Sequence, residues 1–424
     1  MARAPADRCH AGYLVLFLMG VAALLPWNVF ITADGYFGQR LAGTPVATSF
    51  LTYFSMAFNL TALGVLTLNT VCFRSYLPRP SVKITVALVG IALVVFLSTV
   101  LVKTPSIQGM VFFNMTMTSI VVASICAAYL QEGLFELTAT FPERYTQAIM
   151  TGQSLAGFLV SLSAFCIAYL HLNPTTFQMA WYVGDDATES AFSYFLTAFV
   201  TIALAMLAFA AFLKSPVARF YMAPPSNGVV ASLESLLEDA PKGKVTLNPA
   251  KVLWRVRSYA ISVVLAFFLS LAVFPVLTSA VVSSSSNKTF RALFTPLTFV
   301  LFNAGDLFGR IVAGVGPHLL SGRGLVLLSL LRLGFLPLLG LCRLQATTPT
   351  HVVLDHDAYP LVLIFLCAFS NGLVVSLAMM QSAHSVAPHQ RALTGALMFF
   401  CLTFGLTLGA LASFLTHAWL VPSS

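Results

Sequence analysis

Long apolar runs dominate this sequence of 424 residues and decide most of what the chain can fold into. A helix needs about 20 consecutive apolar residues to cross the hydrocarbon core of a bilayer, and eleven runs reach that length. We expect membrane-spanning helices at 12–33, 48–72, 82–102, 110–140, 148–170, 191–213, 258–282, 293–316, 323–345, 358–383 and 391–418. The predicted fold class is therefore an all-α integral membrane protein.

The composition excludes several other classes of protein. Charged residues make up only 8% of the chain, whereas soluble domains carry about 25%. With 58% hydrophobic residues, the chain cannot cover itself with a water-compatible surface, which excludes a cytosolic enzyme, a secreted module and a disordered scaffold. We interpret the net charge of +8 as an excess of Lys and Arg on one side of a membrane, and we expect no nucleic-acid partner.

The distribution of Lys and Arg predicts the topology. If the N-terminus is cytoplasmic and every run crosses, the cytoplasmic segments carry about three times as many Lys and Arg as the outside segments. This count places Lys83 in a cytoplasmic segment. The C-terminus would then lie outside. The sequon Asn287-Lys288-Thr289 falls in a predicted outside loop, so Asn287 is a candidate glycosylation site.

One long polar stretch, 214–257, interrupts the apolar runs. It holds an acidic patch followed by a basic cluster, and we interpret it as a cytoplasmic linker. The linker would divide an N-terminal bundle of six helices (1–213) from a C-terminal bundle of five (258–424). Such a pair of bundles is typical of transporters that bind substrate near the middle of the membrane, where the halves face each other.

The eighth run contains the strongest candidate site. An ionisable side chain at membrane depth costs about 2.5–3.5 kcal/mol, so it normally faces the protein interior and has a partner. Asn303, Asp306 and Arg310 share one helix face, because they are three and four residues apart. Two interpretations are open: a structural ion pair between helices, or a carboxylate that accepts hydrogen bonds from a substrate while the guanidinium holds it.

The fourth run adds Gln131, Glu132 and Glu136. The deep amide of Gln131 suits the donors and acceptors of a nucleobase edge. Glu132 has two open interpretations, a proton carrier or a partner for a basic residue elsewhere. Glu136 lies near the cytoplasmic end, where we expect it to reach lipid headgroups or Arg144.

The first run contains Pro26-Trp27-Asn28. Proline frees a backbone carbonyl and kinks the helix, Trp27 offers a flat face to a planar ring, and Asn28 is a polar neighbour. An interfacial anchor is the alternative for Trp27. Asn59 and Asn371 are further amides inside apolar runs.

Sequence patterns of catalysis are missing from the chain. The eight His residues show no HExxH spacing, and neither a GxSxG nor a phosphate-binding loop occurs. The seven Cys are scattered, which argues against a zinc site or a disulfide framework. We therefore expect no enzyme activity, no cofactor and no metal, and interpret the chain as a passive or ion-coupled carrier.

Four stretches together resemble the equilibrative nucleoside transporter family, and the resemblance extends over nearly the whole chain. They are LLPWNVFITADGYF (24–37), FPERYTQAIMTGQSLAGFL (141–159), FNAGDLFGR (302–310) and FLCAFSNGLVVSLAMM with its continuation TGALMFFCLTFGLTLGA (365–410, including a loop). The resemblance implies a major-facilitator-like fold and facilitated diffusion of nucleosides, sometimes nucleobases, by alternating access.

The resemblance also implies roles for single residues. Trp27 and Ile31 would contact the base or the ribose, with Asn28 beside them, and Gln131 would hydrogen-bond the nucleobase. Asn303, Asp306 and Arg310 would bind the ribose hydroxyls and support that contact. Phe274 and Phe299 would line the apolar side of the pocket, although each taken alone is more typical of a packing or lipid-facing residue. Asn59 and Ala62 would occupy the pocket positions of the second span.

This sequence departs from the family pattern at a few positions. Glu132 stands where a small residue is common, and Asn59 and Ala62 stand where larger apolar residues are common. Gln153 replaces the carboxylate typical of the monoamine-transporting branch, which favours neutral nucleosides. A proton-coupled nucleoside carrier or an organic-cation carrier, using Glu132 or Glu136, is the alternative.

The expected partners are a nucleoside and membrane lipid, and we expect a monomer. The short N-terminus lacks an acidic dileucine signal, which favours the plasma membrane over a vacuolar or lysosomal membrane.

Overall fold

A computed structural model describes residues 5–47, 49–71, 78–170, 185–222, 248–274, 276–344 and 352–420 of the chain. In these ranges the protein is helical apart from loops and two isolated β-bridges. Eleven helices are long and apolar enough to cross a membrane, which confirms the predicted fold class.

The membrane-length helices follow the predicted runs to within a few residues at most ends. They are α1 (Ala11–Thr32), α3 (Phe50–Val71), α4 (Pro80–Val102), α5 (Gly109–Thr138), α6 (Glu143–Leu170), α7 (Asp185–Lys214), α11 (Arg257–Val273) continued by α12 (Val276–Ala280), α13 (Lys288–Val315), α14 (Gly322–Leu331) continued by α15 (Phe335–Gly340), α16 (Ala358–His384) and α17 (Arg391–Leu420). Short helices lie between or before them: α2 (Asp34–Arg40), α8 (Pro216–Met222), α10 (Pro249–Arg255) and the 3-10 turns η1 (Arg8–His10) and η5 (Pro388–Gln390).

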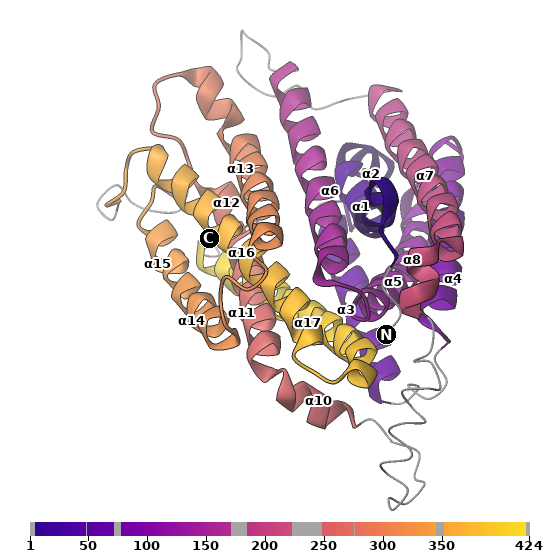
Figure 1. Ribbon diagram of the computed structural model, residues 1–424. Coiled ribbons are helices and arrows are strands. Elements are labelled where there is room, and N and C mark those ends of the chain that lie inside the picture. The colour runs from indigo at the N-terminus through magenta and orange to yellow at the C-terminus, as the bar shows by residue number, and fades with distance from the viewer. Residues whose placement is uncertain are drawn as a thin grey trace, which may run out of the picture.

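The helices form two bundles that lie side by side (Figure 1). Helices α1 to α7 make the first bundle and α11 to α17 the second, with α6 and α13 facing each other across the boundary (Figure 1). Helices α8 and α10 lie at the same end of the molecule, which we call the linker side; the opposite end is the far side (Figure 1). The bundle limits 1–213 and 258–424 remain a prediction. The predicted linker 214–257 contains α8 and α10, while residues 223–247 lie outside the described residues.

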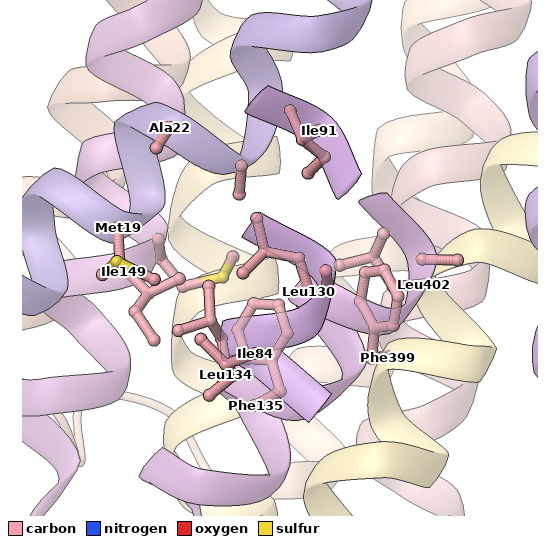
Figure 2. Packing of buried hydrophobic residues seen from close by; sticks show 14 of the residues in the cluster. Met19, Ala22, Ile84, Ile91, Leu130, Leu134, Phe135, Ile149, Phe399 and Leu402 are labelled. Carbon is pink, nitrogen blue, oxygen red and sulfur yellow. The ribbon is translucent and has the colours of Figure 1, made fainter. Parts of the chain in front are cut away.

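The core of the first bundle consists of interlocked aliphatic and aromatic side chains (Figure 2). Met19 of α1, Ile84 of α4, Leu130 of α5 and Ile149 of α6 are all fully buried. Phe135 of α5 stacks on Phe399 of α17 at 5.6 Å between ring centroids, so this core continues into the second bundle (Figure 2).

Two of the predicted spans are interrupted in the structure. The seventh breaks after α11, where Phe274 is extended (φ −104°, ψ 133°). The ninth tightens between α14 and α15 into a 3-10 turn, η3 (Arg332–Gly334). Of the residues at these breaks, Phe274 is half-buried and Arg332 is buried, whereas Leu333 and Gly334 are exposed.

A buried charged cluster ties α3, α4 and α5 together near the linker side. Lys83 Nζ lies 3.2 Å from Glu132 Oε2 and 2.8 Å from Glu136 Oε2. Asn69 Nδ2 donates to Glu132 Oε2 at 3.0 Å, and the Tyr129 hydroxyl donates to Asn69 Oδ1 at 3.1 Å. Of the two interpretations of Glu132, pairing with a basic residue is the one the geometry bears out.

Two expectations about this cluster were wrong. Lys83 is not a residue of a cytoplasmic loop, because it lies within α4 and is 4% exposed. Glu136 contacts Lys83 rather than Arg144, which instead donates to the Tyr145 hydroxyl. The physical reason is that a lysine buried beside carboxylates offsets part of the desolvation cost that each charge would have alone.

On the far side, Asp357 fastens the loop before α13 to the start of α16. Its carboxylate accepts hydrogen bonds from the Ser283 hydroxyl (2.6 Å) and from the backbone N–H of Ser284 (2.7 Å). Partial burial raises the pKa of Asp357, but these hydrogen bonds outweigh burial, and the net pKa is lowered. Asp357 therefore stays ionised, and the loop that carries Asn287 is held in place.

Candidate substrate-binding site

The centre of the candidate site is the crossing of α13 and α16. A Cβ on Gly309 would meet the carbonyl of Phe369, and a Cβ on Gly372 would meet the carbonyl of Asp306. Glycine at both positions is what lets the two backbones touch, as at other close crossings of membrane helices. The contact places Asn371 of α16 directly against Asp306 of α13.

Asp306 is the hub of a buried polar network. Its Oδ2 accepts hydrogen bonds from Arg310 Nε (2.8 Å) and from the Ser154 hydroxyl (2.5 Å). Its Oδ1 accepts from Asn371 Nδ2 at 2.8 Å. The predicted ion pair with Arg310 is thus present, and the carboxyl residue is 8% exposed. An ionised carboxylate offers about four acceptor positions, so these three bonds leave room for one more.

Asp306 and Arg310 also join the two bundles. Ser154 belongs to α6 of the first bundle, and Arg310 Nη1 donates to the carbonyl of Met150 on the same helix at 3.0 Å. Towards the far side, Asn303 Oδ1 lies against Gly157. Towards the linker side, a Cβ on Gly314 would meet the Gln147 side chain. We call this contact of α6 with α13 the inter-bundle seam.

Asn303 turns only part of its side chain to the seam. Its Nδ2 donates to the carbonyl of Phe299 at 2.9 Å, one turn earlier in α13. The residue is half-buried. Asn303 therefore lies at the far-side end of the seam, next to Asp306 along the helix and more accessible than it.

Gln131 lies on α5, on the first-bundle side of α6. Its Oε1 accepts a hydrogen bond from Gln153 Nε2 at 2.9 Å. Gln153 directly precedes Ser154, so α6 links Gln131 and Asp306 through adjacent residues. Because the bond from Gln153 fixes the amide oxygen, Gln131 presents its NH₂ group for a further partner.

The other predicted residues of the first bundle have different surroundings. Trp27 packs on Phe58 of α3 at 5.0 Å between centroids, and both Trp27 and Ile31 are half-buried. Asn28 is 9% exposed, and its Nδ2 has no hydrogen-bond partner within the described part of the chain. Asn59 donates to the carbonyl of Ser55 in its own helix. Phe58, which packs on Trp27, directly precedes Asn59 in α3.

The apolar side of the second bundle is an aromatic group at the break of the seventh span. Phe274 stacks on Phe302 with centroids 4.2 Å apart and meets Phe299 edge-on at 4.9 Å. Phe274 and Phe299 are half-buried, and Phe302 is buried. The extended backbone at Phe274 is what brings its ring over α13, so the two predicted residues do lie together.

Ser154 and Ser270 are polar neighbours of the site that sequence reasoning did not single out. Ser154 contacts Asp306 and Ser270 contacts Asn371. A serine in a membrane helix gives no strong signal of its own, because its hydroxyl can bond the preceding turn. Asn371 carried the clearer signal of an amide inside an apolar run, but its partner Asp306 is 65 residues away.

The arrangement offers hydrogen bonding without redox or nucleophilic chemistry. The Asp306 carboxylate, the amides of Gln131 and Asn303 and the aromatic faces suit a neutral molecule with a planar end and a hydroxyl-rich end. Among the described residues no group of His, Cys, Asp or Glu is placed to hold a metal ion.

Solved transporters share this architecture at low sequence identity. The human organic anion transporter MFSD10 superposes with a TM-score of 0.56 at 14% identity, covering 98% of this chain and 95% of that one. The Major Facilitator Superfamily transporter FucP, in the outward conformation, gives a TM-score of 0.51 at 11% identity and covers 98% of both chains. The predicted major-facilitator-like fold is thereby confirmed.

Curated relatives are similar along nearly the whole sequence. Equilibrative nucleoside transporter 1 of Homo sapiens is 32% identical over 464 residues, covering 98% of both chains. Equilibrative nucleoside transporter 2 of Mus musculus is 32% identical over 467 residues, covering 98% of this chain and 99% of that protein. The family model described as "Nucleoside transporter" matches residues 117–418, which include the whole inter-bundle seam. The chain therefore belongs to the equilibrative nucleoside transporter family, a family of carriers and not of enzymes.

Proposed function

We propose that this protein moves neutral nucleosides, and some nucleobases, across a membrane by facilitated diffusion with alternating access. The observation that carries the proposal is the buried Asp306, which keeps an acceptor position while Ser154, Arg310 and Asn371 hold it. A ribose hydroxyl can donate to such a carboxylate, which the bond from Arg310 Nε holds in place. The base would pack against Trp27 and the Phe274 and Phe299 rings and bond to Gln131, with Asn28, Ile31, Asn59 and Asn303 completing the site.

The inter-bundle seam supports a transport cycle. The seam has four contacts between α6 and α13, the first between Gln147 and Gly314 and the last between Gly157 and Asn303. All four lie in the linker-side part of both helices. We propose that the linker side is closed in this conformation and that the bundles rock apart there to release substrate. The bonds from Ser154 and Arg310 across the seam would break in that step, because they join side chains of different bundles.

A proton-coupled carrier is the second candidate, since Glu132 is a buried and Glu136 a half-buried carboxylate at membrane depth. Lys83 and Asn69 both contact Glu132, which makes a fixed ion pair the favoured interpretation. The charges of this cluster therefore hold three helices together, and we propose that they do not exchange a proton during transport.

The test is a panel of radiolabelled substrates in transporter-deficient cells. We expect saturable uptake of uridine and adenosine in both directions, no uptake of an organic cation, and a flat profile between about pH 5.5 and 8, where a coupled carboxylate or histidine would titrate. The Glu132→Gln variant should keep that flat profile. Uptake that rises steeply towards acid pH and flattens in Glu132→Gln would establish the proton-coupled candidate instead.

We also propose a cytoplasmic N-terminus, an outside C-terminus and an outside loop at Asn287. Asn287 is exposed, and its Oδ1 accepts the N–H of Phe290 at 3.1 Å and so caps α13. Glycosylation takes the other atom of the amide, Nδ2, so cap and glycan are compatible.

Removal of the sequon gives a prediction. Digestion with an N-glycosidase should shift the wild-type band, and the Thr289→Ala variant should lack that shift, because it removes the acceptor sequence and leaves the Asn287 cap in place. Asn287→Asp is the matched variant that also keeps a capping oxygen. Equal shifts in wild type and Thr289→Ala would contradict the outside location.

For the membrane and the assembly we propose a monomer at the plasma membrane, with a vacuolar or lysosomal membrane as the alternative. Surface biotinylation of whole cells tests the location, since only a plasma-membrane protein is labelled. The mass of the purified protein by light scattering, after subtraction of detergent, tests the monomer.

A further inference from the structure

A second arginine lies buried in the membrane-spanning part of the second bundle. Arg332 begins the 3-10 turn η3 and is 1% exposed. Its Nη1 donates to the carbonyl of Ala266 and its Nη2 to the carbonyl of Cys367, at 3.1 and 3.2 Å. In the described residues no carboxylate forms an ion pair with it. A charge kept at that depth without a direct counterion calls for a function beyond packing.

Hydrogen bonds connect this arginine to the candidate site. Arg332 Nη2 donates to the Ser270 hydroxyl oxygen at 2.8 Å. Ser270 donates its hydroxyl proton to Asn371 Oδ1 at 2.9 Å, and Asn371 Nδ2 donates to Asp306 Oδ1 at 2.8 Å. The chain Arg332, Ser270, Asn371, Asp306 therefore crosses from η3 through α11 and α16 to α13, and all four residues are buried.

The direction of each bond matters. A hydroxyl has one proton, so a donor from Arg332 on the Ser270 oxygen leaves that proton for Asn371. Asn371 must then turn its oxygen to Ser270 and its NH₂ group to Asp306. Without the arginine, the serine proton can turn to the preceding helical turn, and the Asn371 oxygen then loses the donor that holds it, which leaves the Asp306 carboxylate alone to orient the amide.

We propose that Arg332 and Ser270 are positioning residues for the substrate-binding carboxylate of Asp306. They orient Asn371 as a donor to Oδ1, the oxygen with the spare acceptor position, and the positive charge of Arg332 polarises the bonds towards Asp306. The inference rests on the proposed function, because it takes the partner of Asp306 to be a ribose hydroxyl. Neither residue touches the substrate.

The Ser270→Ala variant tests this role, with uridine and its dideoxy analogue, which lacks both ribose hydroxyls, as the two substrates. The variant breaks the chain but leaves the bonds of Arg332 to Ala266, Cys367 and Ser370. Loss of one orienting hydrogen bond should raise the KM for uridine by about 3- to 10-fold. The KM for the dideoxy analogue should stay near that of the wild type, and so should the surface abundance.

Ser262→Ala is the matched control, because Ser262 is a buried serine on the same helix α11 whose hydroxyl donates to the carbonyl of Ser258, one turn earlier. It should leave the KM for both substrates unchanged. Arg332→Gln should repeat the effect of Ser270→Ala wherever it reaches the surface.

The measured KM values distinguish a failure of the proposed function from a failure of the positioning role. Failure of the wild type to transport either substrate would refute the proposed function itself. The positioning role would be overturned if the wild type transports uridine but the Ser270→Ala variant changes the KM equally for both substrates. No change in KM for either substrate would overturn it as well. A wild type with the same KM for both substrates would do the same, since Asp306 would then not bind the ribose hydroxyls.

Discussion

Replacing Asp306 by alanine is expected to abolish uptake of uridine and adenosine while the protein still reaches the cell surface. The carboxylate accepts bonds from Ser154, Arg310 and Asn371, and we assign it a substrate hydroxyl as its fourth donor. A hydrogen bond to a charged group contributes about 1.5–3 kcal/mol, which corresponds to about a 10- to 150-fold loss of affinity. Alanine also leaves Arg310 as a buried cation without its carboxylate, which adds to the loss.

Asp306→Asn separates the two effects, because it keeps the shape of the side chain and removes only the charge. We expect it to be expressed at normal levels and to lose at least about tenfold in uptake at low substrate concentration. Asp355→Asn is the control, since Asp355 and its partner Arg343 are both exposed and such surface pairs contribute about 0–1 kcal/mol. Normal uptake by Asp306→Asn would remove the eighth span from the mechanism.

Replacing Lys83 by methionine is expected to destabilise the protein by about 3–5 kcal/mol, the typical cost of breaking a buried ion pair from one side. Lys83 is the shared cation of Glu132 and Glu136, and the side chains of Lys83 and Glu132 are only 3% and 4% exposed. Without it, two carboxylates face each other in a membrane-spanning region. The measurement is the unfolding temperature of the purified protein in detergent, together with its surface abundance.

Two further variants make the Lys83 prediction specific. Adding Glu132→Gln to Lys83→Met removes one of the two charges and should recover most of the lost stability. Lys103→Met is the control at the other end of α4, because Lys103 pairs with Glu189 at the surface, where their side chains are 44% and 66% exposed. Equal losses in Lys83→Met and Lys103→Met would show that the buried cluster does not stabilise the fold.

The spans could be predicted because each is a local property of the chain. A run such as that of α4 must become a helix in lipid, since only a helix satisfies its backbone within one segment. The pair Asp306 and Arg310 was predictable for the same reason, as a spacing of four residues places both on one face of a single helix. The four stretches that resemble nucleoside transporters added the family, which the full-length relatives confirm.

The interruptions of the seventh and ninth spans were not predictable from apolar runs. Phe274 and Arg332–Gly334 both lie within long apolar runs, so hydropathy alone predicts one continuous helix at each place. A local signal other than hydropathy does stand at both places: Pro275 directly follows Phe274, and Pro337 follows Gly334 by three residues, so each removes a backbone N–H that an unbroken helix would use.

The amino-acid sequence by itself thus determined the membrane class, the number of spans, the family and the residue types of the site. Only the tertiary structure decided the partners: Glu132 with Lys83, Asp306 with Ser154 and Asn371, and Arg332 with Ser270. The physical reason is that helix formation in lipid depends on a contiguous segment, whereas a buried polar group is satisfied by whichever helix packs against it.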